Sequence, residues 1–451
     1  MSAFHAYDIR GVWGADLDAD LAYRVGRHLP GLLGARTVLL GRDARRTSPE
    51  AAEALARGVT ESGADVDDIG LCTTPMTYFF TGERGYKAAA MVTASHNPRE
   101  YNGIKISREG ALPVGGDSGL KTLEALVAGP LPPPAAKRGS VRRLDVLGDY
   151  LAFHRSFLPD LSGLRIVFDG SDGVGPLVAK PLYASCGAEA FWINDVPNGD
   201  FPHHEPNPLL ASAREQLASA VRERGADLGV LFDGDADRVA FVDETGAFVR
   251  PDLVTAFLAE PFLAREPGAA VLCDVRTSRS VTERIAALGG VPHLWKVGHA
   301  FAKVKLRELR AVVGGELAGH YYFRDFHNCD SAMLCASIAL GRFAEAKRRG
   351  VPLSELVRRL DKYAGSGEIN KLVADKPAAV AAVADWIRRG PAPDRVLDFD
   401  GIRADWPDRW VNVRISNTEP YLRIVAEAET PEKLSALLAE VGAVTAPFET
   451  K

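Results

Sequence analysis

The sequence predicts an α/β protein of several domains, with mostly parallel sheets and a smaller α+β domain at its C-terminal end. A chain of 451 residues is too long for one ordinary core, and this length indicates about three or four domains. Three times, a short apolar run is followed by a polar loop and then a helical pattern. This alternation is typical of β-α units around a mostly parallel sheet.

The three apolar runs are residues 37–41 (TVLLG), 164–170 (LRIVFDG) and 269–275 (AAVLCDV), and each predicts a strand. In the first unit, Ser48 before Pro49 predicts a helix N-cap followed by proline at the first helical position. Loops at the carboxyl ends of such strands are where α/β proteins place their chemistry. The three passages are candidates for distant structural repeats, but their sequences are too dissimilar to establish this.

The C-terminal end of the chain has a different order of elements. Residues 410–416 (WVNVRIS) and 421–429 (YLRIVAEAE) predict two strands on either side of the turn NTEP. The stretch TPEKLSALLAEV follows and predicts a capped amphipathic helix. This β-β-α order indicates the smaller α+β domain. Two stretches rich in proline and glycine, 129–140 and 389–394, predict loops or domain boundaries.

The composition limits the partners that we expect. The net charge of −5 gives no indication of a nucleic-acid or membrane-surface partner. Five cysteines form no CxxC pair and fit no zinc pattern, so we expect reduced thiols. The start of the sequence lacks the apolar region of a signal peptide, and no window approaches the ~18 apolar residues of a membrane span. We therefore expect a cytoplasmic protein.

The stretch DGDADR carries three alternating aspartates, Asp233, Asp235 and Asp237, directly after the apolar run DLGVLF. Packed together at a strand end, these carboxylates would repel each other unless a cation neutralised them. Hard carboxylate oxygens suit Mg²⁺, so the spacing predicts a magnesium site; an acidic surface turn is the alternative. The neighbouring Arg238 favours the metal site, because a cation and a guanidinium together suit a transferring phosphoryl group.

The stretch TASHNPREYNGIKIS places Ser95 in a polar loop behind the apolar run AAAMV. A serine hydroxyl is a poor nucleophile unless a base, a metal or a cationic setting activates it. His96 is adjacent, but neighbouring side chains on an extended loop point apart, which argues against a Ser–His dyad. We therefore favour a phosphoserine, within reach of Mg²⁺ and of Lys105. A capping serine in a loop is the alternative.

Three shorter motifs are weak by themselves. YDIRG places Arg10 near the N-terminus, and KVGH contains Lys296 and His299. GGELAGH carries Glu316 and His320, a carboxylate and an imidazole that suit vicinal hydroxyls; a glycine-rich turn with a surface histidine is the alternative. The stretch FDGSDGVG has the glycines of a phosphate loop but neither GxGxxG nor GK[ST], so it predicts a structural turn between a strand and a helix.

The predicted hairpin VRISNTEP contains several hydrogen-bond donors that are close together in sequence. A guanidinium fork, two hydroxyls and backbone N–H groups form a good cup for a phosphate dianion. A tight turn, in which Asn and Thr are ordinary, is the alternative. The residues of this candidate phosphate cup are Arg414, Ser416, Asn417 and Thr418.

Taken in this order, the motifs closely resemble the α-D-phosphohexomutase superfamily, over nearly the whole chain from YDIRG to RISNTEP. TASHNP with NGIK, and DGDADR, are the most specific of them. YDIRG and SNTEP resemble the phosphomannomutase/phosphoglucomutase branch of the superfamily. The phosphoglucosamine branch usually has a TDGIRG-like start and an SGTEP-like phosphate loop.

The resemblance implies four domains around a central cleft. The first three would be related α/β domains with mixed sheets, and the last a smaller α+β domain. We expect a phosphoserine-loop domain at 1–144, a metal-binding domain at 145–247, a sugar-binding domain at 248–365 and a phosphate-binding domain at 366–451.

The resemblance also implies a role for each candidate residue. Ser95 would be the phosphorylated serine and, with Asp233, Asp235 and Asp237, would hold Mg²⁺. The catalytic residues besides Ser95 would be Arg10, Lys105, Arg238 and His299. The residues that bind the sugar phosphate would be His96, Lys296, Glu316, His320, Arg414, Ser416, Asn417 and Thr418.

The reaction implied is the interconversion of hexose 1-phosphate and hexose 6-phosphate, of mannose, glucose or both. It would pass through a phosphoserine and a hexose 1,6-bisphosphate, which also serves as activator. Phosphoglucosamine mutase and a Mg²⁺-dependent sugar phosphatase are the alternatives. The sugar loop GGELAGH departs from the family, with Ala318 in place of the usual serine, and the nearby KVGH has Val297 where threonine is frequent, so the preferred epimer stays open. We expect a monomer or homodimer that acts on small sugar phosphates.

Overall fold

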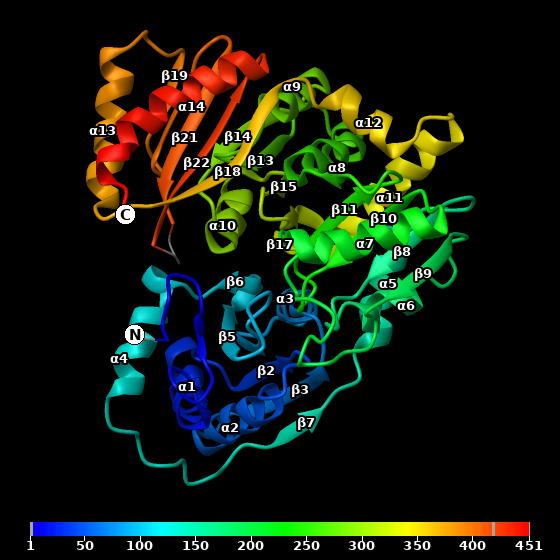
Figure 1. The fold of residues 1–451 in the computed structure, drawn as a ribbon. Coiled ribbons are helices and arrows are strands. Elements are labelled where there is room, and N and C mark those ends of the chain that lie inside the picture. The colour runs from blue at the N-terminus through cyan, green and yellow to red at the C-terminus, as the bar shows by residue number, and fades with distance from the viewer. Residues whose placement is uncertain (1–2, 417–419, 451) are drawn as a thin grey trace.

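The computed structural model describes residues 3–416 and 420–450 (Figure 1). Within them, four sheets follow one another along the chain, one of seven strands and three of five. The first sheet lies at the bottom of Figure 1 and the fourth at the top left, with the second and third on the right and in the centre. Within the described residues, no helix combines the length and the apolar character that crossing a membrane requires.

The first sheet has the strand order β1-β5-β4-β2-β3-β7, with β6 paired to β5. Its strands are β1 (Ile9–Val12), β2 (Thr37–Arg42), β3 (Asp65–Leu71), β4 (Ala88–Val92), β5 (Tyr101–Arg108), β6 (Leu112–Pro113) and β7 (Val141–Arg143). The helices of this part are α1 (Ala19–Leu33), α2 (Ser48–Glu61), α3 (Thr74–Glu83) and α4 (Leu120–Ala128), and α5 (Leu147–Arg155) leads to the second sheet.

The second and third sheets have the orders β12-β11-β10-β8-β9 and β14-β13-β15-β16-β17. The second part contains β8 (Arg165–Asp169), α6 (Pro176–Tyr183), β9 (Glu189–Ile193), α7 (Ala211–Arg224), β10 (Leu228–Phe232), β11 (Val239–Asp243) and β12 (Phe248–Val249). The third contains α8 (Pro251–Arg265), β13 (Ala270–Asp274), α9 (Arg279–Ala287), β14 (Val291–Trp295), α10 (His299–Leu309), β15 (Val313–Gly315), β16 (Tyr321–Phe323), β17 (Cys329–Asp330), α11 (Ala332–Arg348) and α12 (Leu353–Leu360).

The first three sheets share one topology. In each, the strand predicted from the apolar run (β2, β8 or β13) lies between two parallel neighbours, and the second of these neighbours (β4, β10 or β15) pairs with an antiparallel strand. The prediction of repeated β-α units is therefore confirmed. The mostly parallel sheets expected from the apolar runs are not found, whereas the mixed sheets that the resemblance implies are confirmed, since each of these three sheets has parallel and antiparallel pairs. The loops after β4, β10 and β15 are too short for a parallel crossover, so the chain returns antiparallel.

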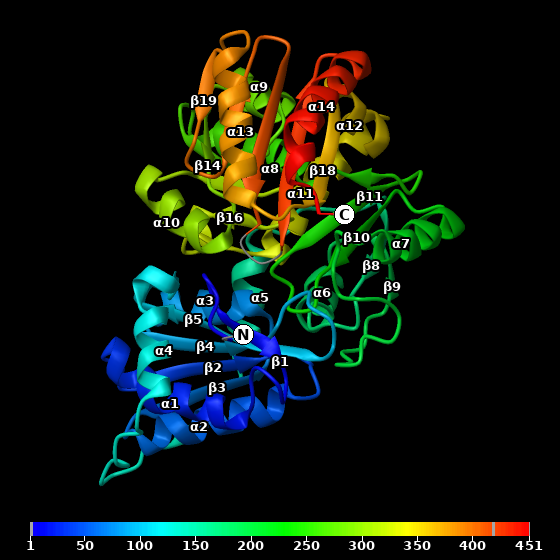
Figure 2. The same ribbon diagram turned by 60° about the vertical axis from the view of Figure 1, so that its left-hand side comes forward.

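The fourth sheet is antiparallel throughout, in the order β18-β22-β21-β20-β19. Helices α13 and α14 lie against one of its faces (Figures 1 and 2). The predicted strand pair and its capped helix are confirmed, because the Thr430 hydroxyl oxygen accepts from Lys433 N. The elements are β18 (Ala364–Leu372), α13 (Lys376–Arg389), β19 (Arg395–Leu397), β20 (Ile402–Asp405), β21 (Arg409–Ile415), β22 (Tyr421–Ala428) and α14 (Pro431–Thr445).

Packing joins the first three domains more closely to one another than to the fourth. One cluster of buried side chains runs through all three, including Phe79, Phe168 and Phe323. The fourth domain has its own core, to which Val413 and Leu437 belong. The limits of the four domains at residues 144, 247 and 365 stay predictions.

One local prediction is wrong. Ser48 is the first residue of α2 and Thr47 precedes the helix, so Ser48 is not the N-cap. Its hydroxyl instead donates to Asp43 Oδ1 at 2.6 Å, which ties the start of the helix to the loop after β2.

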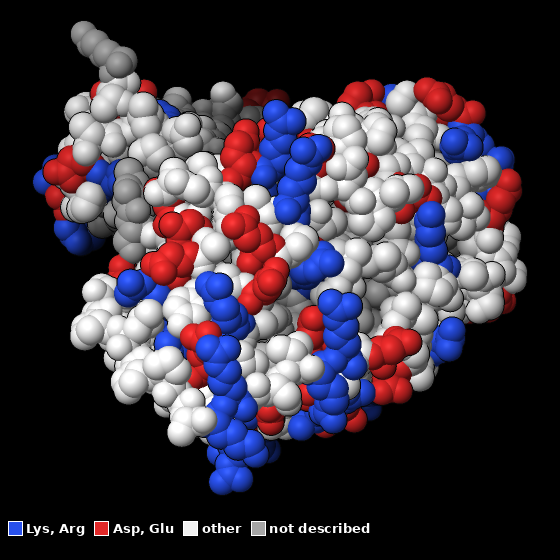
Figure 3. All heavy atoms as spheres, turned by 90° about the horizontal axis from the view of Figure 1, so that it is seen from below, with Lys and Arg blue, Asp and Glu red and all other residues white. Residues whose placement is uncertain are grey.

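Figure 3 shows the molecule from below, with basic and acidic side chains interspersed over that face.

Candidate active site

Three loops carry half of the predicted residues, and they follow equivalent strands of the three related sheets. Ser95 follows β4, the three aspartates follow β10, and Glu316 with His320 follows β15. Each loop therefore begins at the carboxyl end of a parallel strand, where α/β proteins place their chemistry.

Ser95 is buried and lies against the acidic loop of the second domain. Its hydroxyl donates to Asp233 Oδ2 at 2.8 Å, and its backbone N–H donates to Thr93 Oγ1 at 2.9 Å. Its φ of 50° is in the left-handed region, which is uncommon for a residue with a side chain. Such strain persists only where the surroundings impose it, and it is frequent at functional sites.

The prediction that Ser95 and His96 point apart is wrong. Ser95 Oγ lies 3.3 Å from His96 Nδ1, because the left-handed turn at Ser95 replaces the extended loop on which the prediction depended. Burial, and then the charges of Arg238 and Arg10, hold the pKa of His96 well below its usual range. The imidazole therefore stays neutral beside the hydroxyl.

The three aspartates form one compact group. Their carboxylate oxygens lie within 4.8 Å of one another, and all three residues are buried. Asp233 Oδ1 accepts from the backbone N–H groups of Asp237 and Arg238, each at 3.1 Å, so the loop wraps around this carboxylate. A Cβ on Gly234 would approach Ser95 O to 2.6 Å, so the glycine allows the two loops to meet.

Lys105 is the cation closest to this group. Its ammonium donates to Asp235 Oδ2 at 2.7 Å and to Asp237 Oδ2 at 2.6 Å. Burial favours the neutral forms, but Lys105 together with the other donors and positive charges nearby outweighs burial and lowers the pKa of Asp235 and Asp237. Burial, and then the charges of Asp237 and Asp235, raise the pKa of Asp233 well above its usual range.

This charge distribution fits a metal ion. Lys105 forms ion pairs with two of the three carboxylates, and in the described part of the chain no cationic side chain pairs with Asp233, whose charged form therefore calls for a further cation. Asp235 Oδ1 and Asp237 Oδ1 are buried without a hydrogen-bond partner in the described part of the chain. Buried carboxylate oxygens without donors are the ligands that a hard divalent cation takes.

Arg10 reaches the Ser95 loop from β1, which pairs antiparallel with β5. One terminal nitrogen donates to Asn97 Oδ1 at 2.6 Å, and the other is paired with Asp8. The guanidinium is therefore fixed between the edge strand of the first sheet and the loop that carries the serine.

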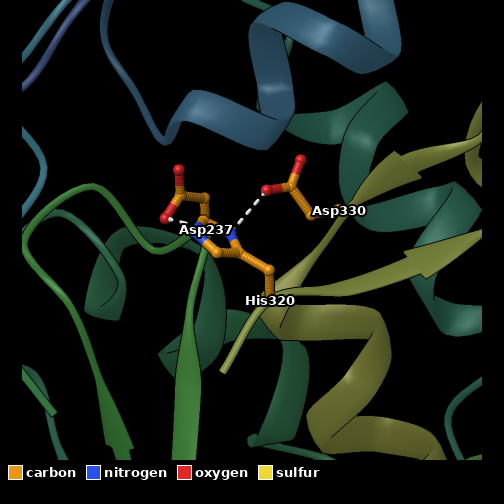
Figure 4. A group of neighbouring side chains, drawn as sticks. All are labelled: Asp237, His320 and Asp330. Atoms are coloured by element: carbon orange, nitrogen blue, oxygen red, sulfur yellow. Dashed lines mark hydrogen bonds and ion pairs between the residues drawn. The ribbon is translucent and has the colours of Figure 1, made fainter. Parts of the chain in front are cut away.

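Arg238 connects the acidic loop to the sugar loop, residues 314–320. Its Nε donates to His320 Nε2 at 3.0 Å, and a β-bridge joins the two residues. On the other side, His320 Nδ1 lies 2.7 Å from Asp330 Oδ2 and 3.8 Å from Asp237 Oδ1, as the dashed lines of Figure 4 mark. The buried Lys303 lies 2.8 Å from Asp330 Oδ1. Asp237, His320 and Asp330 thus form a second group of possible metal ligands. Because Arg238 and Lys303 already supply positive charge to this group, we assign no metal to it.

The sugar loop is in turn bound to the KVGH stretch. Glu316 Oε1 accepts from Gly298 N at 2.7 Å, and burial raises the pKa of Glu316. The rings of His299 and His320 lie 5.8 Å apart between centroids. The Nδ1 atom of His299 is buried without a hydrogen-bond partner in the described residues. Lys296 lies over the ring of Phe301, at 5.6 Å from its centroid.

The described half of the phosphate cup belongs to the end of β21. Arg414 is buried, and its Nε lies 3.2 Å from Asp400 Oδ1. The other oxygen of Asp400 accepts from Val297 N at 2.8 Å, which joins the cup to the KVGH stretch. Ser416 is also buried. The predicted residues Asn417 and Thr418 lie outside the described residues.

Sequence reasoning missed four side chains of this arrangement: Asp8, Lys303, Asp330 and Asp400. Asp8 lies just before β1 and two residues before Arg10, and this spacing is a signal that the sequence offers. Lys303, Asp330 and Asp400 come from a helix, a strand and a loop without any distinctive motif, so only the fold places them.

Comparisons with known proteins agree along the whole chain. Four family models of phosphoglucomutase/phosphomannomutase match: α/β/α domain I over residues 1–129, domain II over 153–246, domain III over 250–363 and the C-terminal domain over 368–443. A phosphomannomutase of Salmonella typhimurium is 40% identical over 439 residues, with 95% of both chains covered. A protein of Xanthomonas campestris described as phosphohexose mutases is 40% identical over 435 residues, again with 95% of both chains covered.

Solved structures share the fold. A phosphoglucomutase/phosphomannomutase family protein of Burkholderia thailandensis superposes with a TM-score of 0.89 at 29% identity, and the match covers 99% of this chain and 98% of that one. An N-acetylphosphoglucosamine mutase of Aspergillus fumigatus, in complex with GlcNAc-6P and magnesium, has a TM-score of 0.63 at 16% identity, with 99% and 96% covered. The family models and the relatives at 40% identity confirm the predicted family: the chain belongs to the phosphoglucomutase/phosphomannomutase family of phosphohexomutases.

Proposed function

We propose that this phosphohexomutase moves phosphate between O1 and O6 of a hexose, with Ser95 as the carrier of the phosphoryl group. The observation that carries the proposal is the contact of the buried Ser95 hydroxyl with Asp233, inside a group of three carboxylates. From there, contacts continue through Arg238 and His320 to the sugar loop, and through Val297 and Asp400 to Arg414. These contacts connect residues of all four domains around a single site.

The reaction consists of two transfers in opposite directions. In the first, the bond between Ser95 Oγ and phosphorus breaks while a free sugar hydroxyl oxygen bonds to phosphorus. The proton of that hydroxyl passes to a base and ends on Ser95 Oγ. The hexose 1,6-bisphosphate then turns end for end, and its other phosphate returns to Ser95 by the same steps in reverse. Catalysis is mostly positioning and electrostatic stabilisation.

His299 is the candidate base. Burial, and then the charge of Lys303, lower the pKa of His299 to about 3, so the free imidazole is neutral at physiological pH. Its Nδ1 is free to accept a proton. Two phosphate groups in the site would raise this pKa and so strengthen the base. Lys105 cannot serve in the same way, because its two carboxylate partners raise its pKa and keep it charged.

The acidic group supplies the metal site of the proposal. Asp233, Asp235, Asp237 and an oxygen on Ser95 would hold Mg²⁺, which supplies positive charge for the transferring phosphoryl group. Arg238 and Arg10 add fixed positive charge from two sides, since His320 and Asn97 orient their guanidinium groups.

The phosphate cup would hold the phosphate that does not react. Arg414, Ser416, Asn417 and Thr418 form it, and one cup must accept either end of the sugar because the intermediate turns around. Asp400 lies against the Nε side of the Arg414 guanidinium. His96, Lys296, Glu316 and His320 would bind the sugar and its phosphate.

Mannose, glucose or both are the proposed sugars, and the named relatives favour mannose. Ala318 in the sugar loop removes a hydroxyl that the family usually has, but Glu316 and His320 remain. Phosphoglucosamine mutase and a sugar phosphatase with an aspartate nucleophile are less well supported, because the relatives at 40% identity are named phosphomannomutase and phosphohexose mutases. We propose a cytoplasmic monomer or homodimer, activated by hexose 1,6-bisphosphate.

A coupled assay tests this function. The enzyme is given mannose 1-phosphate or glucose 1-phosphate with a trace of the matching 1,6-bisphosphate, and hexose 6-phosphate and inorganic phosphate are measured in parallel. We expect hexose 6-phosphate to form and inorganic phosphate to stay at background. Release of inorganic phosphate at the rate of substrate consumption would instead identify a phosphatase.

A further inference from the structure

Arg45 lies in the loop between β2 and α2, and its guanidinium binds the loop that carries Ser95. The residue is buried, with 1% of its surface exposed. Nη1 donates to Pro98 O at 2.7 Å and to Tyr101 O at 3.0 Å. Nη2 donates to Ser95 O at 2.9 Å and to Asn97 O at 2.6 Å. One side chain therefore binds four backbone carbonyls between β4 and β5.

Two of these carbonyls, Ser95 O and Asn97 O, have no donor other than Arg45 among the described residues, whereas Pro98 O also accepts from Tyr101 N at 3.1 Å. With the left-handed turn at Ser95, the carbonyl oxygens of Ser95 and Asn97 both point toward Nη2 of Arg45. A buried carbonyl oxygen without a donor destabilises the conformation that contains it, so the loop would not hold this conformation without a donor at that point. The same turn places the Ser95 hydroxyl against Asp233.

The guanidinium is itself held in place by its own loop. Arg45 Nε lies 3.2 Å from Asp43 Oδ2, and the backbone N–H of Arg45 donates to Asp43 Oδ1 at 3.0 Å. Asp43 Oδ1 also accepts from Ser48 Oγ, to which Asn102 donates from the far side of the serine loop. Asp43 at Nε and the backbone carbonyls at Nη1 and Nη2 therefore hold the guanidinium in one orientation.

The second domain covers the outer face of the guanidinium. The ring of Phe201 lies 5.0 Å from the guanidinium carbon, and Phe201 is itself buried. Gly199 packs so closely on this loop that a Cβ would lie 2.5 Å from Ala44 O. Phe201 and Gly199 thus exclude water from the four hydrogen bonds, and these bonds are stronger for that.

We propose that Arg45 is a positioning residue for the phosphoryl carrier: it fixes the left-handed conformation of Ser95 and so aims the hydroxyl at the acidic group. Residues 198–201 of the second domain support this role of Arg45, because they enclose its guanidinium. The proposal deepens the proposed function and rests on it. A lysine cannot replace Arg45, because its three donors from one nitrogen do not match four carbonyls on two sides of a planar fork.

The test compares Arg45→Lys with wild type and with Arg36→Met, a matched control at the exposed start of β2. Turnover is measured per phosphorylated enzyme, with phosphate content from intact mass. We expect kcat to fall by about 100-fold, as a misplacement of about 1 Å does elsewhere, while KM changes by less than about threefold. Arg36→Met should keep both constants. A merely structural role would lower the folded fraction and leave kcat per phosphorylated enzyme unchanged, which overturns the proposal.

Two further variants cover the case in which Arg45→Lys does not fold and test the proposed function separately. If Arg45→Lys does not fold, Phe201→Leu takes its place, with an expected fall in kcat of about tenfold at unchanged KM; wild-type kcat would overturn the proposal. Ser95→Ala separates this proposal from the function on which it rests. Inactive Ser95→Ala with fully active Arg45→Lys contradicts only the role of Arg45, whereas fully active Ser95→Ala contradicts the phosphoserine mechanism itself.

Discussion

Arg238 Nε donates a hydrogen bond of 3.0 Å to His320 Nε2, across 82 residues of sequence. Because Nε2 accepts, the ring hydrogen of His320 lies on Nδ1, which donates to Asp330 Oδ2 at 2.7 Å. The tautomer of His320 therefore fixes the direction of the Arg238 guanidinium. In this way the sugar loop of the third domain orients a cation of the second.

Removal of Arg238 should affect the chemical step more than substrate binding. Loss of one oriented donor at a developing charge typically lowers kcat by about 10²–10³-fold. We expect this for Arg238→Ala, with a much smaller change in KM, in steady-state assays with hexose 1-phosphate. Arg222→Ala, on the surface of the same domain, is the control. An equal loss in both variants, or an unchanged kcat in Arg238→Ala, would contradict the assignment.

Replacement of His299 should remove a general base that is neutral in the free enzyme. We expect His299→Asn to lower kcat/KM by about 10²–10⁴-fold, whereas His293→Asn on β14 should not. The pKa of His299 is lowered to about 3, so its neutral form prevails above that pH and is lost only as pH falls toward it. The ratio of wild-type to variant kcat/KM should therefore stay constant from about pH 5.5 to 8, since the substrate phosphate titrates in both. A ratio that drops near the ordinary histidine pKa would refute this role.

Metal removal should abolish turnover and also lower thermal stability. Three buried carboxylates with one lysine retain uncompensated negative charge, and a bound cation relieves it. At a Mg²⁺ concentration 100 times its Kd, the gain in unfolding free energy is about 2.7 kcal/mol. We expect EDTA to lower Tm and MgCl₂ to restore it. Asp235→Asn should lose most of this response and the exposed Asp117→Asn should keep it; a Tm indifferent to Mg²⁺ in wild type would argue against the site.

Arg414→Ala should weaken the binding of hexose 1-phosphate and hexose 6-phosphate to a similar extent, because one cup accepts either end. Loss of a hydrogen bond to a charged group costs about 1.5–3 kcal/mol, or about a 10- to 150-fold loss of affinity. Calorimetric titration of both isomers into an inactive Ser95→Ala background measures this, with Arg388→Ala on α13 as control. If only one isomer binds more weakly, two separate phosphate sites must replace the single cup.

The fold was accessible from the sequence where local patterns decide it. The apolar runs that became β2, β8 and β13 each lie between two parallel neighbours, and their alternation with helices predicted the repeated units. The mixed character of the sheets was not accessible from those runs alone. It follows from the short loops after β4, β10 and β15, which force an antiparallel return.

The candidate site was predictable where several polar residues are adjacent in sequence. DGDADR and TASHNP each mark a loop, and the resemblance places them together. The conformation of the loops was not predictable, so the geometry of Ser95 and His96 was misjudged. Arg45 binds backbone carbonyls about 50 residues further along the chain, and Asp400 joins Arg414 to Val297 of the preceding domain; a sequence contains no local pattern for such contacts.

The transfer of phosphate from Ser95 is the most direct test of the account. Enzyme with radiolabelled phosphate on Ser95 is mixed with unlabelled hexose 1-phosphate, and the label is followed in a single turnover. The account predicts that the label moves to hexose 1,6-bisphosphate and hexose 6-phosphate, and that Ser95→Ala neither carries label nor turns over. Label found only as inorganic phosphate, or wild-type turnover in Ser95→Ala, would contradict it.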